Sequence, residues 1–99
     1  MRKCVKITIT EFGDLDALYA LLKKKLSFDD LEGYAEPVLD DELHIVVYGP
    51  KEAVDLFVGS LEDVILAENE KRKHEIVYFF EPFLKEEDYR GVFRFVKKA

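Results

Sequence analysis

Few residues in this chain of 99 amino acids have types and spacings that suit chemistry. Neither GxxxxGK[ST] nor GxGxxG occurs, so the glycine-rich loops that bind phosphate are missing from the sequence. The possible soft metal ligands are Cys4, His44 and His74, and no two lie close together, whereas ligand pairs are usually about two to five residues apart. No serine or threonine has a histidine at a spacing typical of nucleophilic catalysis. We therefore predict no catalytic residue, no cofactor and no metal ligand.

Two short acidic clusters and two arginines are the remaining candidates for ion binding. Residues 40–42 and 86–88 each hold three adjacent carboxylates, which could bind Mg²⁺ or Ca²⁺ through oxygen. Three neighbouring side chains on one tight turn point apart, so we interpret both clusters as solvated surface. Arg90 and Arg94 could bind an anion, and the sequence leaves open whether either one does.

Charge is unevenly distributed along the chain, whose formal net charge is −6. Residues 29–63 hold eleven acids and a single base, Lys51, a net charge of −10 in the middle third. This charge repels polyanions, so we predict no direct nucleic-acid binding by the isolated chain. The aromatic residues 78–80 resemble a stacking platform for single strands, but no basic stripe accompanies them. We interpret the acidic region as a solvated face or as a docking surface for a basic partner.

Composition places these residues in one folded domain, 1–99. Apolar residues make up 48% and charged residues 36%, which excludes a disordered or low-complexity chain. No apolar stretch approaches the roughly 20 residues of a membrane helix, so no membrane association is expected. One cysteine and no visible signal peptide predict a cytoplasmic protein. Gln is absent, Asn69 is the only Asn, and Lys and Glu are abundant, which is typical of thermophiles.

Hydropathy patterns predict seven elements. Strands are expected within 5–10, 34–39, 43–48, 74–80 and 92–96, and amphipathic helices within 15–26 and 50–69. Asp14 suits the N-cap of the first helix, and Pro50 suits the first position of the second. Gly59 within the second helix costs about 1 kcal/mol relative to Ala, which a close helix crossing would explain. The order β-α-β-β-α-β-β predicts an α+β, ferredoxin-like fold with two helices on one face of an antiparallel sheet.

Two of the predicted strands are apolar on both faces. Strand side chains alternate, so Phe79 and Phe80 must point to opposite faces, although the pattern does not tell which one faces the core. Two helices cover only one face, and a second copy or another subunit is expected to cover the other. We therefore predict a homodimer or a heteromer whose interface includes Phe57, Leu61, Ile65, Tyr78, Phe79, Phe80, Phe93 and Phe95.

Residues 43–54, LHIVVYGPKEAV, resemble the third strand and the start of the second helix of acylphosphatases. Residues 33–37, GYAEP, lie where that family has a Gly-aromatic-Val-x-Asn segment, and the catalytic Asn falls on Pro37. Residues 11–14 contain no phosphate-binding Arg, while 89–94, YRGVFR, are similar to the family's arginine loop at the other end of the chain. The resemblance implies the topology without the catalytic pair. It supports an alternative function, a small acylphosphatase-like enzyme or an anion-binding protein.

Residues 5–70 resemble the small, dimer-forming Pcc-type subunit of KEOPS, the archaeal and eukaryotic complex that makes threonylcarbamoyladenosine in tRNA. The similar segments are 17–22, ALYALL, the strand 43–47, LHIVV, and the helix 59–68, GSLEDVILAE, in which Gly59 replaces the family's usual Asn. The strands from His74 onward have no counterpart. The resemblance implies an archaeal accessory subunit, and we predict a non-catalytic protein-interaction or dimerisation module.

Overall fold

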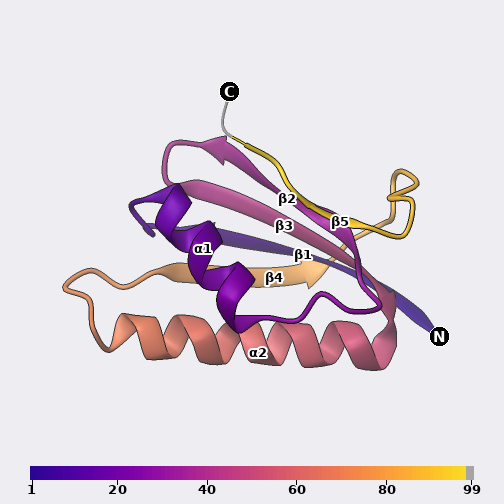
Figure 1. The fold of residues 1–99 in the computed structure, drawn as a ribbon, viewed down its shortest axis with the longest axis horizontal. Helices are drawn as coiled ribbons and strands as arrows, with labels where there is room; N and C mark the ends of the chain where they lie inside the picture. The colour runs from indigo at the N-terminus through magenta and orange to yellow at the C-terminus, as the bar shows by residue number, and fades with distance from the viewer. Residues whose placement is uncertain (98–99) are drawn as a thin grey trace.

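Five strands form one sheet and two helices pack against it in the computed structural model, which describes residues 1–97 (Figure 1). The sheet order is β4-β1-β3-β2-β5. The elements in chain order are β1 (Arg2–Thr10), α1 (Leu15–Lys25), β2 (Glu32–Leu39), β3 (Glu42–Pro50), α2 (Lys51–Asn69), β4 (Val77–Pro82) and β5 (Phe93–Phe95).

Strand directions make this a mixed sheet in an α+β fold. β1 is antiparallel to β3 and β4, and β2 is antiparallel to β3. β5 is parallel to β2, with Gly33 opposite Phe93, so the predicted fully antiparallel sheet is wrong for this strand. The reason is the path of the chain, which leaves β4 at one edge and enters β5 beside the start of β2.

Helix starts follow the local sequence. Asp14 caps α1 as predicted, since its Oδ1 accepts from the backbone N–H of Asp16 at 2.9 Å and of Ala17 at 3.4 Å. Three lysines, 23–25, fill the last turn, where positive charge suits the helix dipole. Pro50 lies one position before its predicted place, because it is still paired with Arg2 as the last residue of β3.

The main core lies between the helices and one face of the sheet. Alternate residues of β1 and β3 point into it, and four residues of α2, one side of the helix, meet them there. β3 is apolar on both faces, as predicted, because Val46 is buried on the side away from the helices. The largest fully buried side chains are Ile7, Ile9, Leu22, Leu43, Ile45, Leu61, Ile65, Val46, Val47 and Val54.

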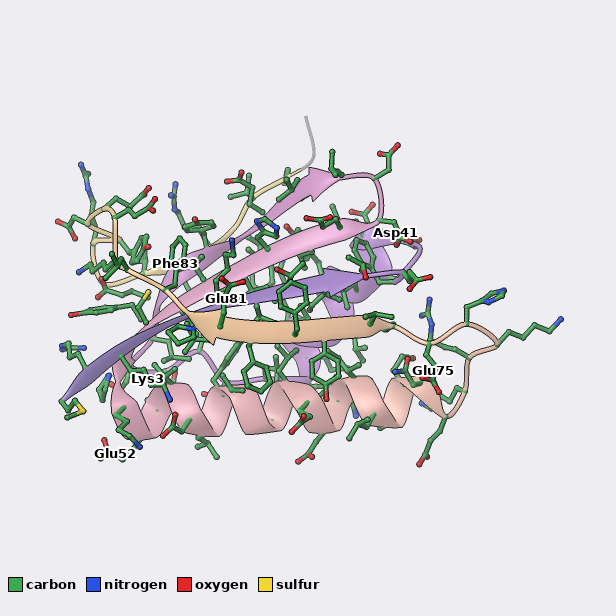
Figure 2. All side chains as sticks on the ribbon, turned by 180° about the vertical axis from the view of Figure 1, so that it is seen from behind. Lys3, Asp41, Glu52, Glu75, Glu81 and Phe83 are labelled. Atoms are coloured by element: carbon green, nitrogen blue, oxygen red, sulfur yellow. The ribbon has the colours of Figure 1, made fainter. Side chains whose placement is uncertain are left out.

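Residues 83–92 cover part of the second face of the sheet, on the side shown in Figure 2. The Tyr89 ring is buried, with its centroid 5.8 Å from that of Tyr34. The Lys85 ammonium lies 4.2 Å from the centroid of the Tyr48 ring. We predicted that a partner would cover the second face of the sheet. Over this part of the face, residues 83–92 of the same chain cover it instead.

β4 begins at Val77 rather than His74, because the side chain of Asn69 binds the preceding residue. Its Oδ1 accepts from the Ile76 N–H at 2.7 Å, and its Nδ2 donates to the Ile76 carbonyl at 3.0 Å. Both main-chain groups of Ile76 are thereby removed from pairing with another strand. On the other side of the sheet, the pairing of β2 with β3 shifts register between Pro37 and Leu39, next to a proline that has no N–H to donate.

Two glycines should respond oppositely to replacement by alanine. A Cβ on Gly33 would lie 1.9 Å from the Val46 carbonyl oxygen, at a φ of 138°. We expect Gly33→Ala to lower the free energy of unfolding by roughly 3 kcal/mol or more. Gly59 has open space around it, so Gly59→Ala should raise that free energy by about 1 kcal/mol. Urea denaturation measures both, and shifts of equal sign would contradict the two environments.

Candidate interaction surface

One edge of β4 carries main-chain groups that no part of residues 1–97 binds. Val5 pairs with Pro82, and one position further the Phe83 N–H donates to the Cys4 carbonyl at 3.1 Å. Hydrogen bonding alternates along an antiparallel strand, so the odd residues of β4 bond to β1. The N–H and C=O groups of Tyr78 and Phe80 therefore point outward.

The run of unpaired main-chain groups along β4 is short, because the residues at both of its ends cannot pair with a further strand. On one side, the amide of Asn69 binds both main-chain groups of Ile76. On the other side, Pro82 has no N–H to donate. The remaining groups, on Tyr78 and Phe80, suit a partner strand of a few residues.

Apolar side chains lie on both faces of this edge. Phe79 is 54% exposed and opposite Thr8, on the face away from the helices. Phe80 is 47% exposed and opposite Ile7, on the helix side. The predicted opposition of the two rings is confirmed, and Phe80 is the one that faces the helices. Glu81, labelled in Figure 2, is the charged residue of β4.

α2 continues the surface beyond β4. The Tyr78 hydroxyl donates to Glu62 Oε2 at 2.6 Å, which places this side of α2 next to the strand. Gly59, Glu62 and Leu66 share that side, since residues three and four apart lie on one stripe of a helix. Leu66 is 53% exposed, and Gly59 has no neighbour within 4 Å of the place of a Cβ. We call Val77, Tyr78, Phe79, Phe80, Gly59, Glu62 and Leu66 the β4 edge surface.

The other predicted interface residues pack inside the chain. Phe57, Leu61 and Ile65 are buried in the core, so they offer no surface to a partner. Phe93 and Phe95 are half-buried against Phe28 and Tyr19, with centroid distances of 4.5 Å from Phe93 to Phe28 and 5.0 Å from Phe95 to Tyr19. Of the predicted set, only the residues of β4 belong to the β4 edge surface.

The candidate soft metal ligands do not converge. Cys4 is opposite Tyr48 and His44 is opposite Thr8, which separates them by several positions along β1. His44 Nε2 lies 3.0 Å from Glu42 Oε2. Burial raises the pKa of the Cys4 thiol, and nearby Lys85 opposes this effect. His74 is exposed in the segment after α2, and residues 1–97 contain no cluster of His, Cys, Asp or Glu suited to a metal ion.

One carboxylate of each short acidic cluster accepts a hydrogen bond from a main-chain N–H. Asp41 Oδ1 accepts from the Gly13 N–H at 2.7 Å, and Asp88 Oδ1 accepts from the Arg90 N–H at 2.8 Å. Arg90 and Arg94 line a hollow of about 330 Å³ that Glu87 and Asp88 also line. These carboxylates offset the attraction that the two guanidinium groups would exert on an anion.

Sequence patterns missed the part of the surface that α2 supplies. Gly59 was conspicuous within a helix, but its position relative to β4 depends on the tertiary fold. Asn69 was conspicuous as the single Asn, and nothing local indicates that it binds Ile76 across the turn. The periodicity that predicted α2 was also the signal that Phe57, Leu61 and Ile65 face inward.

No model of a known protein family matches the sequence, and no characterised protein matches it at a significant level. Among the described residues, neither α1 nor α2 has the length and apolar content needed to cross a membrane. The geometry of the β4 edge surface is therefore the main guide to function.

Replacing Asn69 should destabilise the fold beside β4. Asn69→Ala removes both hydrogen bonds to Ile76, a residue whose side chain is buried, and we expect a loss of about 1–3 kcal/mol in the free energy of unfolding. Glu70→Ala, at the exposed neighbouring position, is the matched control and should change that free energy by less than about 0.5 kcal/mol. Equal values for the two variants in urea denaturation would contradict the role of Asn69.

The contact between Tyr78 and Glu62 should be visible in an alkaline titration. The hydrogen bond to Glu62 raises the pKa of Tyr78 from 10.0 to about 12. The contribution of this group to stability is thus present below pH 10 and is lost as the pH rises from 10.0 to about 12. In Glu62→Gln the pKa of Tyr78 should fall toward 10.0, as followed by phenolate absorbance with Tyr78→Phe to assign the signal. Superimposable titrations of the wild-type chain and Glu62→Gln would show that the contact is not formed.

Proposed function

We propose that this chain is a non-catalytic protein-interaction module that joins a second polypeptide by strand addition at β4. The observation that carries the proposal is the outward-facing N–H and C=O groups of Tyr78 and Phe80, flanked on both faces by exposed phenyl rings. Such an edge binds an extended segment through main-chain hydrogen bonds, and its side chains add apolar contacts.

The contrast between the two edges of the sheet supports this proposal. Proteins protect exposed edges with proline, bulges, charges or very short strands. β2 has Pro37, a register shift and the short strand β5 along its outer side. β4 has none of these between Tyr78 and Phe80, and its charged residue and proline, Glu81 and Pro82, come only at its end.

The proposal extends to fold type and biological setting. We propose that β1 to β4 and the two helices follow the ferredoxin-like plan, with β5 added, and the antiparallel order β4-β1-β3-β2 supports this. The resemblance over residues 5–70 supports an accessory role in a cytoplasmic tRNA-modifying complex. The alternative, an acylphosphatase-like enzyme, gains no support, because Pro37 is paired opposite Leu43 and the two arginines share their hollow with carboxylates.

An accessory subunit with this charge should not bind nucleic acid by itself. The net charge of −10 over residues 29–63 opposes the release of counterions that drives nonspecific binding. We expect no shift of tRNA or duplex DNA with the isolated full chain at micromolar concentration and physiological salt. A salt-dependent shift in that range would contradict the assignment.

Strand addition can be tested on the assembly that the full chain forms in its native host. We expect Phe79→Asp to lose the associated polypeptides, because a carboxylate would be buried in an apolar contact. Leu84→Asp is the matched control, since Leu84 is 83% exposed and lies outside β4, and it should retain them. Equal melting temperatures would show that both variants are folded.

Amide hydrogen exchange supplies the second measurement. In the assembly, exchange at Tyr78 and Phe80 should be slower than in the dilute chain, because an added strand binds those N–H groups. The proposal fails if Phe79→Asp retains the same polypeptides in the same amounts. It also fails if the two amides exchange at equal rates in the assembly and in the dilute chain.

A further inference from the structure

We infer that the strand bound at β4 is β4 of a second copy of this chain. The two strands pair antiparallel about a two-fold axis that passes midway between Phe79 and the partner's Phe79. The inference rests on the proposed function and names the partner for the same surface. It follows from three features of the β4 edge surface: the spacing of the free main-chain groups, the side chains that flank them, and the gap at Gly59.

The free main-chain groups select one register. A two-fold axis perpendicular to the sheet keeps the two faces aligned, so one residue must lie directly opposite its own copy, with the axis midway between the two. With the axis at Phe79, Tyr78 lies opposite the partner's Phe80, and every free N–H and C=O of both residues is bonded. An axis at Phe80 would set the Tyr78 carbonyl against the partner's Pro82, which has no N–H. An axis at Tyr78 would oppose Phe80 to the partner's Ile76, which Asn69 already occupies.

The same register brings the exposed rings together. Phe79 faces the partner's Phe79 in a non-hydrogen-bonded pair, the closer of the two pair types, with Cα atoms about 4.5 Å apart. Both rings lie on the face away from the helices, where each is 54% exposed in the single chain. On the helix side, Tyr78 and the partner's Phe80 lie side by side. Apolar groups that are exposed in one copy therefore cover their equivalents in the other.

α2 fits the same axis. Contacts of Asn69 with Ile76 and of Glu62 with Tyr78 show that α2 runs antiparallel to β4, with Phe79 level with the region of Glu62. Gly59 precedes Glu62 by three residues and Leu66 follows it by four. Rotation about the axis therefore places Leu66 beside the partner's Gly59. The open space at Gly59 receives a side chain that is otherwise 53% exposed, and the two helices can approach closely there.

The charge of the surface predicts a salt dependence. Glu62 and the partner's Glu62 would lie near the axis, and each chain has a net charge of −6. Repulsion between the copies is screened by salt, whereas the apolar contacts are not. Added salt should therefore tighten self-association.

Disulfide cross-linking tests the register. In a Cys4→Ser background, Phe79→Cys should form a dimer on mild oxidation, because the paired Cα distance lies within the range of disulfides. Glu81→Cys is the matched control on the same face, where the two copies would be roughly 13 Å apart. Cross-linking of Phe79→Cys alone supports the register. Cross-linking of neither variant, of both equally, or of Glu81→Cys alone overturns it.

The contact at Gly59 is tested by comparing association with stability. Gly59→Gln should raise the melting temperature of the dilute chain, since glutamine favours helix over glycine, and should weaken dimerisation at least tenfold, about 1.4 kcal/mol. Ala67→Gln, which adds the same side chain at an exposed position away from β4, should leave the dissociation constant within about twofold. Unchanged association in Gly59→Gln overturns the helix contact.

Sedimentation of the purified full chain separates this inference from the proposed function. A dimer at micromolar concentration that Phe79→Asp dissociates and added salt tightens supports both. A monomer at all concentrations overturns the inference, while the proposed function stands if Phe79→Asp still loses its partners in the native host. Retention of those partners by Phe79→Asp overturns the proposed function as well.

Discussion

A β-strand has two hydrogen-bonding edges, and an open sheet must leave one exposed at each side. In this protein the constraint is met differently at the two sides. At β2 the chain adds β5, and the Tyr19 hydroxyl donates to the Val96 carbonyl at 2.7 Å, which fixes the chain directly after the added strand. At β4 the side chain of Asn69 binds the main-chain groups of Ile76, the residue directly before the strand, and leaves the strand itself unprotected. The exposed groups of Tyr78 and Phe80 are what remains after this internal protection.

Sequence patterns predicted the features that depend on local periodicity. The alternation in β1 and β3, the cap at Asp14 and the opposite directions of Phe79 and Phe80 each follow from a few neighbouring residues. The direction of β5 was missed, because a strand of three residues carries no signal for parallel or antiparallel pairing. The interaction surface was predicted in part, since the aromatic residues of β4 were identified while Gly59 and Leu66 join them only through the tertiary fold.

Residues 83–92, between β4 and β5, both connect the two strands and cover part of the second face of the sheet. They carry the chain from one edge of the sheet to the other, and in doing so they place Tyr89 over Tyr34 and Lys85 over Tyr48. Lys85 Nζ also lies 3.4 Å from Glu32 Oε1, and this ion pair offsets part of the negative charge of residues 29–63. Apolar residues on the second face are therefore covered near the start of β1, while Phe79 stays exposed farther along β4.

The interior position of β1, between β4 and β3, has a consequence for the order in which the sheet forms during synthesis. β1 precedes both of its partners, β3 and β4, by a long stretch of chain. The hairpin of β2 and β3 joins neighbouring residues and can form early. β1 can pair only after β3 and β4, which are distant in the chain, have been made. The apolar face of β1, with Val5, Ile7 and Ile9, therefore leaves the ribosome well before the segments that cover it have been made. These three side chains, all buried in the finished core, are thus among those that stay exposed to water longest while the chain is being made.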